Sequence, residues 1–359
     1  MMYRDIDILP KKSVGDSGTE TVDLDVTDPI TELSVTLDLT NGGAKALNKT
    51  PVHVITKIEV VDGGTVYASL TGAEAFAAFF YETGHVPVHL LSEVASEAQA
   101  VILPLRFGRF LGDPLRNLDV TKLRNPQIKV TWAKDSLHLA SSLYLTVKAK
   151  LLTDVPGAAN ALLIKDVRSF TTASSGDEDT ELPTDYPIRR LFVRPWVAEP
   201  CAANILSHYK IDCDSGRFVP LDMSGWDLQE EIERIFGYAQ IRHDIYATNG
   251  DKKQTWLGYS MGASVATAAS GYIANLWCSK NSYGVIYGFK HDGTSMDEQK
   301  CEMLVYGALP HNVFCIPFGL QDYPETWFPA PTFRKVLLRV TQAEADATAY
   351  ISVQQDRPL

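Results

Sequence analysis

The pentapeptide Gly258-Tyr259-Ser260-Met261-Gly262 is the part of this chain that most resembles a catalytic motif. It matches G-x-S-x-G, the nucleophile elbow of serine hydrolases, in which a strand-to-helix turn exposes the serine hydroxyl. Such chemistry also needs an acid and then a histidine, because the imidazole must take the hydroxyl proton. Only His291 and His311 follow Ser260, at a shorter interval than such folds use, and no HGGG-like oxyanion loop precedes it. A serine hydrolase using Ser260 is therefore a remote alternative, and we expect no enzyme.

Two histidines have the spacing of zinc ligands. His85 and His89 stand four residues apart, as on one face of a helix. Pro87 between them disfavours a helix, and no acidic or cysteine partner stands at ligand spacing. We interpret both as solvent-facing loop histidines. Since the chain also has no Gly-rich phosphate loop, the sequence predicts no catalytic, cofactor-binding or metal site and no cofactor.

The remaining reactive side chains are cysteines and a run of acids. Residues 174–181 are polar and include Asp177, Glu178 and Asp179, which we interpret as a solvated loop between two domains. The cysteines are odd in number and form no C-x-x-C pair, so we expect reduced, buried thiols in place of a disulfide or zinc framework. They are Cys201, Cys213, Cys278, Cys301 and Cys315.

A repeat organises the elements that would have to position any such site. Residues 57–84 and 210–237 are two versions of one passage, aligned without a gap at a separation of 153 residues. Lys57 matches Lys210 in this alignment, and Gly72 matches Gly225. What the copies retain is turns and apolar patterning, which specify a shape more than a chemistry. The sequence therefore predicts one structural unit used twice.

Each copy begins with a predicted hairpin. Apolar and polar residues alternate over residues 57–61 and 209–213, the pattern of half-buried strands. Both stretches run into residues that tolerate positive φ, Asp62-Gly63-Gly64 and Asp214-Ser215-Gly216. We expect a tight turn and a short return strand in each copy.

A helix is predicted after each hairpin. Thr71 and Glu74, like Ser224 and Asp227, have the spacing of a capping box, in which a hydroxyl and a carboxylate satisfy unpaired backbone N–H groups. Apolar residues then recur on one helical face. Glycine suits the left-handed position that ends a helix, and each copy has one there, Gly84 and Gly237.

The two halves also end with similar segments, but the separation between these segments is larger than that between the repeated passages. Residues 102–108 correspond to residues 316–319 at a separation near 210, so the second copy has gained roughly 58 residues. We place this insertion at about residues 238–312. Within it, residues 254–279 are uncharged and longer than the ~20 residues of a membrane span. Glycine and serine dilute the apolar residues, so we do not expect a transmembrane helix.

Composition and strand pattern predict two β-sandwiches. A chain of 359 residues fits two domains, which we place at 21–155 and 185–359, with an arm at 1–20 and a linker at 156–184. Each half has many short strand patterns, one helix and long loops. The net charge of −11 and the absence of a basic run argue against direct nucleic-acid binding.

These features resemble a known family. The segments that carry the likeness are residues 105–114, 125–128 and 186–191, together with the two turn-helix units, in the same order in both halves. The chain resembles the double-jelly-roll major capsid proteins of tailless icosahedral viruses, the lineage of tectivirus, corticovirus and adenovirus hexon proteins. The resemblance implies an all-β fold of two tandem jelly-roll β-sandwiches, each with a short helix after a β-hairpin.

The resemblance also implies a structural function. In that family a homotrimer forms a pseudo-hexameric capsomer, and capsomers tile an icosahedral shell with minor capsid and vertex proteins. A duplicated domain suits this packing because it supplies two similar but independently variable faces per chain. The implied location is the virion, assembled in the host cytoplasm. The insertion would form an outward tower or a clamp between subunits.

Many shells of this lineage enclose a lipid membrane, which suggests a function for residues 1–18. Arg4, Lys11 and Lys12 lie there near apolar residues, and a basic residue near anionic lipid contributes about 1 kcal/mol. A disordered or neighbour-clasping terminus is the alternative. Charges also interrupt this segment where a signal peptide needs an apolar core, so we expect no secretion signal.

A second class of function is a β-sandwich module, virion-associated or secreted, that binds carbohydrate or a receptor. Such modules display a planar aromatic platform, although scattered tryptophans more often fill cores. The candidates for a platform are Trp196, Trp226, Trp256, Trp277 and Trp327.

Overall fold

The structure is a computed structural model. It describes residues 2–43, 50–134, 140–197, 201–247, 252–254, 256–267, 274–278, 285–290 and 299–359.

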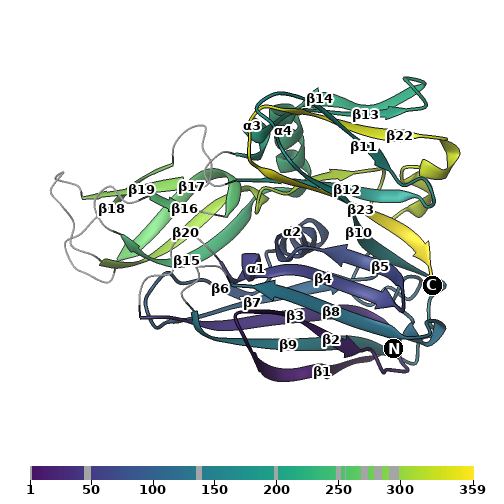
Figure 1. The fold of residues 1–359 in the computed structure, drawn as a ribbon, viewed down its shortest axis with the longest axis horizontal. Helices are drawn as coiled ribbons and strands as arrows, with labels where there is room; N and C mark the ends of the chain where they lie inside the picture. The colour runs from purple at the N-terminus through teal and green to yellow at the C-terminus, as the bar shows by residue number, and fades with distance from the viewer. Residues whose placement is uncertain are drawn as a thin grey trace.

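The first half of the chain forms two facing sheets, the first sandwich (Figure 1). Alternate residues point inward, as in β3, where Leu33, Val35 and Leu37 are buried. One sheet has the order β1-β9-β3-β7-β6, and the facing strands have the order β2-β8-β4-β5. The bounds are β1 (Met2–Val14), β2 (Ser17–Asp23), β3 (Ile30–Asn41), β4 (Ile55–Asp62), β5 (Thr65–Leu70), β6 (His89–Leu90), β7 (Ala98–Arg106), β8 (Pro126–Ala133) and β9 (Ala140–Thr153).

The second half repeats this arrangement as the second sandwich. Its strands have the orders β10-β23-β12-β21 and β11-β22-β13-β14, which match the first sandwich strand for strand when β6 is set aside. The duplication therefore extends to every strand of the sandwich. The bounds are β10 (Asn160–Thr171), β11 (Gly176–Leu182), β12 (Ile188–Trp196), β13 (Leu206–Cys213), β14 (Phe218–Ser224), β21 (Phe314–Pro317), β22 (Val336–Gln342) and β23 (Thr348–Pro358).

A β-bulge recurs at equivalent positions of the two sandwiches. β1 pairs Asp7 with Lys148 and then skips one residue, Ile8, before Leu9 pairs with Val147. β10 pairs Asp166 with Ser352 and likewise skips Val167 before Arg168 pairs with Ile351. Because a β-bulge fixes local register, Asp7 and Asp166 occupy equivalent positions in the two sandwiches.

The repeat is not gapless, which corrects the alignment from sequence. Ile55 and Leu206, 151 residues apart (206 − 55), each follow a one-turn helix and precede a register shift against the next strand. Thr71 and Ser224, which start the longer helices, are 153 apart (224 − 71). The second hairpin loop contains the two additional residues, since Asp62 pairs with Thr65 but Cys213 pairs with Phe218. Lys57 and Lys210 are therefore not equivalent.

The predicted helices are present. They are α2 (Gly72–Thr83) and α4 (Gly225–Phe236), preceded by the short α1 (Pro51–Val54) and α3 (Ala202–Ile205). One-turn 3₁₀ helices η1 (Val120–Lys122), η2 (Pro324–Thr326) and η3 (Ala330–Thr332) lie in loops.

The capping box is complete in one helix only. The Thr71 hydroxyl accepts from the Glu74 backbone N–H at 3.2 Å, and the Glu74 carboxylate accepts from the Thr71 N–H at 2.8 Å. In α4 the Ser224 hydroxyl accepts from the Asp227 N–H at 3.1 Å, but the shorter Asp227 carboxylate bonds the hydroxyl instead of the backbone. The helix ends differ as well, because Gly84 is left-handed (φ 74°, ψ 3°) whereas Gly237 has ψ −153°.

Two stretches predicted to be irregular are strands. Residues 176–182 form β11, paired along its length with β22, so the solvated-loop interpretation of the acidic run is wrong. Thr341 and Arg339 of β22 bind Asp177 and Asp179, which offsets the charge that argued against a strand. The predicted N-terminal arm is also wrong for residues 2–14, which form β1 against β9.

The insertion forms two further three-stranded sheets beside the sandwiches (Figure 1). Their orders are β15-β20-β17 and β16-β19-β18. Among the described residues, no helix is long and apolar enough to span a membrane. The bounds are β15 (Ala239–Ala247), β16 (Lys252–Gln254), β17 (Leu257–Thr267), β18 (Ala274–Cys278), β19 (Val285–Lys290) and β20 (Gln299–Pro310).

Gly72 should not tolerate a side chain. A Cβ atom there would lie 2.3 Å from the carbonyl oxygen of Val52, so α1 and α2 would have to separate. We expect Gly72→Ala to lower the free energy of unfolding by about 1–3 kcal/mol, although alanine favours helix, as measured by urea denaturation. Gly64→Ala is the control, because nothing lies within 4 Å of its Cβ position. Equal effects of the two substitutions would contradict the close helix packing.

Candidate functional site

The two sandwiches join along one line, here called the seam. β5 and β10 pair in parallel at Ser69 and Lys165, which merges four strands from each sandwich into an eight-stranded sheet. Figure 1 shows α2 between the two sandwiches at this place. From α2 the Tyr81 hydroxyl donates to the backbone oxygen of Val313 at 2.6 Å. The seam therefore includes backbone pairing and helix contacts.

Two carboxylates meet under the seam. Ser352 Oγ lies 2.6 Å from Glu74 Oε1 and 2.9 Å from Asp166 Oδ1, and Ser69 Oγ lies 2.8 Å from Asp166 Oδ2. The four side chains come from α2, β5, β10 and β23, so the cluster includes both sandwiches. Lys57 and the buried Arg194 are the cations that act on it.

This geometry favours a proton on one of the two acids. One serine hydroxyl has one hydrogen and cannot donate to both acids, so a proton on Asp166 completes the chain of hydrogen bonds from Asp166 to Ser352 to Glu74. Burial, followed by repulsion from Glu74, raises the pKa of Asp166 to about 6. Near neutral pH the seam thus contains an acid close to its titration point.

A second buried ion cluster ties α2 to β12. Glu82 Oε2 lies 2.9 Å from Arg189 Nη1 and 2.7 Å from Arg190 Nη1, and all three side chains are almost fully buried. Burial, and then the neighbouring Arg190, lower the pKa of Arg189. Arg190 Nε also donates to the Gln321 side chain at 2.6 Å. One carboxylate therefore compensates two guanidinium groups across the seam.

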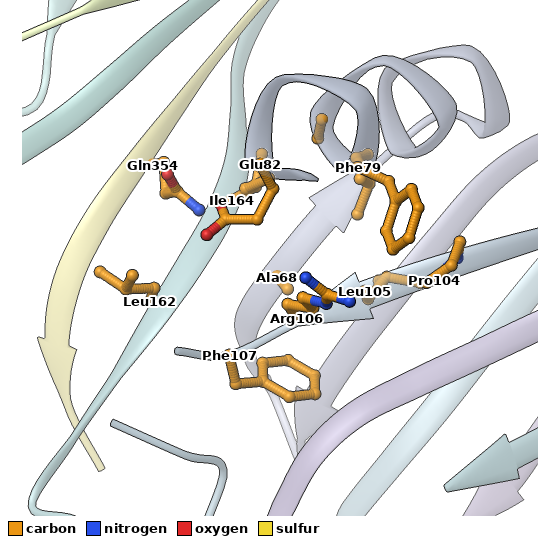
Figure 2. A pocket seen from close by; sticks show the side chains of 12 residues that line it. Ala68, Phe79, Glu82, Pro104, Leu105, Arg106, Phe107, Leu162, Ile164 and Gln354 are labelled. Carbon is orange, nitrogen blue, oxygen red and sulfur yellow. The ribbon is translucent and has the colours of Figure 1, made fainter. Parts of the chain in front are cut away.

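The cavity between α2 and the strands of the seam is too small for a ligand. A cavity of about 30 Å³ lies between α2, β5, β7, β10 and β23, room for about one water molecule. Figure 2 shows Phe79, Glu82, Arg106, Ile164 and Gln354 around it. The seam is thus a structural joint with no substrate pocket at this cavity.

The loop after β7 also depends on close contacts. Asp113 accepts from Arg109 Nε at 2.7 Å and from the backbone N–H groups of Arg109 and Leu115. These hydrogen bonds outweigh burial and lower the pKa of Asp113. A Cβ atom at Gly108 would lie 2.6 Å from the Asp113 Cβ, which explains the glycine in this segment. Arg116 then bonds Asp356 of β23 through two nitrogens.

The catalytic-looking serine lies in the wrong context for a hydrolase. Gly258 to Gly262 lie inside β17, which pairs antiparallel with β20, so no strand-to-helix turn is formed there. His291 lies outside the described residues. The ring of the buried His311 packs against the rings of Phe76 and His53, with centroid distances of 4.7 Å and 5.2 Å. Burial lowers the pKa of His311 well below the usual value.

The zinc-spaced histidines do not share one surface. His85 is exposed, as predicted, but His89 belongs to β6 and is half-buried, with Nδ1 2.8 Å from the Pro87 oxygen. Burial lowers the pKa of His89. The solvent-facing interpretation is therefore wrong for His89. Among the described residues no three metal-ligating side chains gather.

The cysteines and tryptophans fill the interior where the structure describes them. Cys201, Cys213 and Cys315 are free and buried, as predicted, and burial raises the pKa of Cys315 to about 12. Trp256 and Trp327 are buried and Trp196 is half-buried. The side chains of Cys278, Cys301 and Trp277 lie outside the described part of the chain.

Sequence reasoning missed the residues that form the seam. Glu74 was recognised only as a capping residue, and Asp166, Glu82 and Ser352 were not singled out. Their partners lie 97 to 278 residues away along the chain, so no local spacing indicates them. The available signal was weak: Glu82 directly follows the aromatic run Phe79-Phe80-Tyr81, whereas Asp166 stands among the charged residues Lys165 and Arg168 of an ordinary strand pattern.

Comparison with known proteins identifies the fold. No model of a protein family matches the sequence, and no curated protein sequence matches it. The structure is similar to the STIV major capsid protein (10% identity, 99% of this chain and 96% of that one, TM-score 0.63). It is also similar to the PBCV-1 virus capsid protein (12% identity, 99% of this chain and 93% of that one, TM-score 0.60). A third similar structure is major capsid protein P2 from bacteriophage PM2 (10% identity, 99% of this chain and 98% of that one, TM-score 0.55). The chain thus has the double-jelly-roll fold of these proteins, which confirms the all-β prediction and the resemblance.

Replacing Asp166 by Asn should raise stability at neutral pH. The pKa of Asp166 is about 6 when folded, against about 3.9 when unfolded, so the folded state alone retains the proton between these values. The wild-type chain therefore loses stability as the pH rises from about 4 to about 6, and Asn removes that loss of about 1–3 kcal/mol. Urea denaturation across this range measures it.

Asp179→Asn is the matched control. The hydrogen bond to Arg339 lowers the pKa of Asp179, so its stabilisation is lost only as the pH falls through values below the window in which Asp166 titrates. We expect this control to keep the wild-type slope between about pH 4 and about pH 6. An Asp166→Asn protein with the wild-type slope would contradict a proton on Asp166.

Glu82→Gln tests the second cluster. The amide keeps the shape but removes the charge that compensates Arg189 and Arg190, so we expect a loss of about 3–5 kcal/mol in the free energy of unfolding. Glu231→Gln, which breaks an exposed pair with Arg234 on α4, should cause no measurable change. Similar melting temperatures for both variants would show that the seam does not depend on Glu82.

Proposed function

We propose that this chain is a viral major capsid protein. The observation that supports it best is the duplicated strand order joined at one seam, over a chain that matches capsid proteins along nearly its whole length. An assembly function does not need a catalytic pocket. It needs rigid blocks with faces that repeat, and the two sandwiches are such blocks.

The assembled form we propose is a homotrimer. Three chains with two sandwiches each present six similar blocks, a pseudo-hexamer that can tile a shell with its neighbours. The partners are then further capsomers and minor capsid or vertex proteins, and the location is the virion, assembled in the host cytoplasm. The charge of −11 gives no support to direct nucleic-acid contact.

The insertion is proposed to project outward or to clamp a neighbouring subunit. A hollow of about 590 Å³ lies where it meets the loop after α2. Its lining includes Val88, 73% exposed, and the exposed Tyr238. Apolar side chains left in water at such a place are typical of contact surfaces.

A membrane contact through the N-terminal residues stays a prediction. Their cations already have partners, because Arg4 pairs with Asp28 at 3.1 Å and Lys11 with Asp38 at 2.8 Å. Lys12 likewise pairs with Glu20. This pairing reduces the charge that the segment could offer to anionic lipid.

The domain boundaries are also a proposal. Because β10 and β11 correspond to β1 and β2, we propose that the second jelly roll starts near Asn160 and that β1 belongs to the first. The linker predicted at 156–184 would then shrink to a few residues before β10. The binding-module and hydrolase alternatives gain no support from the described residues.

Purified protein should be a trimer of about 119 kDa, three times the 39.6 kDa chain, by light scattering after size exclusion. The physical reason is that one chain has only two sandwiches, whereas the proposed capsomer needs six. Negative-stain images should show hexagonal outlines. A monomer at micromolar concentration, with or without affinity for glycans, would contradict the proposal and favour the binding module.

A further inference from the structure

The seam within the chain is a template for a contact between chains. β5 receives β10 on its free side, and the equivalents of these strands are β14 and β1. β14 is the last strand of its sheet, and β1 is the first strand of its own. In the described part of the chain, neither edge pairs with a second strand. The duplication therefore leaves one edge strand with an unpaired side at each end of the described molecule, β14 at one and β1 at the other.

We propose that β1 of one copy pairs in parallel with β14 of the next copy and so repeats the seam between subunits. This inference rests on the proposed trimer and specifies its interface. Figure 1 places β14 and β1 at opposite ends of the molecule, so one chain cannot pair its own edges. The contact is heterologous. The ring of three chains closes if each of its six junctions, three within chains and three between chains, turns one sandwich by about 60° relative to the next.

The register follows from two independent alignments. The shared β-bulge makes Asp7 the equivalent of Asp166. Ser69 and Asp222 stand equally far before their helix caps, and they face Glu59 and Lys210 on the preceding strands. Since Ser69 Oγ lies 2.8 Å from Asp166, the side chains of Asp7 and Asp222 should meet across the interface.

Lysines of the same chains balance the charges of these two acids. Asp222 lies 2.9 Å from Lys210 and 3.2 Å from His208 within its chain, and Asp7 lies 3.6 Å from Lys148. Joining the edges brings two carboxylates and two ammonium groups together, which is neutral before the histidine is counted. In the template, Lys57 likewise moderates the repulsion at Asp166. An acid pair is thus tolerable between copies.

Burial gives a second line of support. Tyr3 is 48% exposed and Met2 is exposed on β1, whereas their equivalents on β10, Leu162 and Ala161, are fully buried in the seam. On β14, Phe218 is 48% exposed. Edges that expose large apolar side chains favour pairing with another strand. Pro220 lacks an N–H donor but stands two residues before Asp222, outside the single pair that the template uses.

Paired cysteines test the interface in the full chain. Neighbouring strands lie about 4.8 Å apart, within the reach of a disulfide. A chain with both Asp7→Cys and Asp222→Cys, oxidised with copper phenanthroline, should give covalent dimers and trimers on a non-reducing gel. The two single variants, co-expressed, should give dimers but no trimers, because each chain then has one partner only.

Controls separate this contact from others. Each single variant alone should stay monomeric on the gel, which accounts for the five native cysteines. Asp7→Cys with Asp177→Cys should also stay monomeric, because Asp177 is exposed on β11, at the other edge of the sheet that ends in β14. Crosslinking of this control as strong as that of the test pair would overturn the proposal.

A measurement on the wild-type protein does not depend on the variants. A carbodiimide joins touching carboxylate and amine groups, so mass spectrometry should find Asp7 linked to Lys210 of another copy. Trimers that show neither this link nor the disulfide would overturn the strand pairing while the proposed function stands. A wild-type chain that does not form trimers would overturn both.

Discussion

The two sandwiches merge into one sheet where β5 and β10 pair in parallel, at Ser69 and Lys165. Further backbone contacts lie beside this pair, such as the hydrogen bond from the Leu162 N–H to the Phe107 oxygen and the bridge between Arg116 and Asn160, and buried polar side chains add to them. Glu74, Asp166 and Glu82 restrict the geometry of the joint, because carboxyl groups removed from water need fixed partners, which here lie on both sides of the seam. For Asp166 this restriction costs stability once the group is ionised. The proposed ring depends on the angle between the sandwiches, which these contacts restrict.

The fold was largely predictable because its signals are local. Gly63 and Gly84 take the positive φ that a turn and a helix end require, and Thr71 with Glu74 forms the capping box that its spacing indicates. Alternation identified the strands around Ile58 and Ile211. The catalytic-looking serine could also be doubted from the sequence, because His291 and His311 follow it at too short an interval and no HGGG-like oxyanion loop precedes it.

What could not be predicted depends on contacts across the chain. The two added residues in the second hairpin are invisible to a gapless alignment, because a shift of two preserves the inward face of a strand. β1 and β11 contain charges that suggested an arm and a loop, yet their partners on β9 and β22 lie far away in sequence. Asp166 looks like an ordinary strand residue until Ser352 and Glu74 are placed beside it.

The duplication then has a mechanical consequence: a joint made once within the chain can be made again between chains. The most direct test is a cryo-electron microscopy reconstruction of the purified protein, calculated without imposed symmetry and at a resolution that separates strands. We expect six jelly rolls in a ring, with junctions within and between chains that superimpose. A ring whose two kinds of junction use different strands, or a particle with one or two chains, would contradict it.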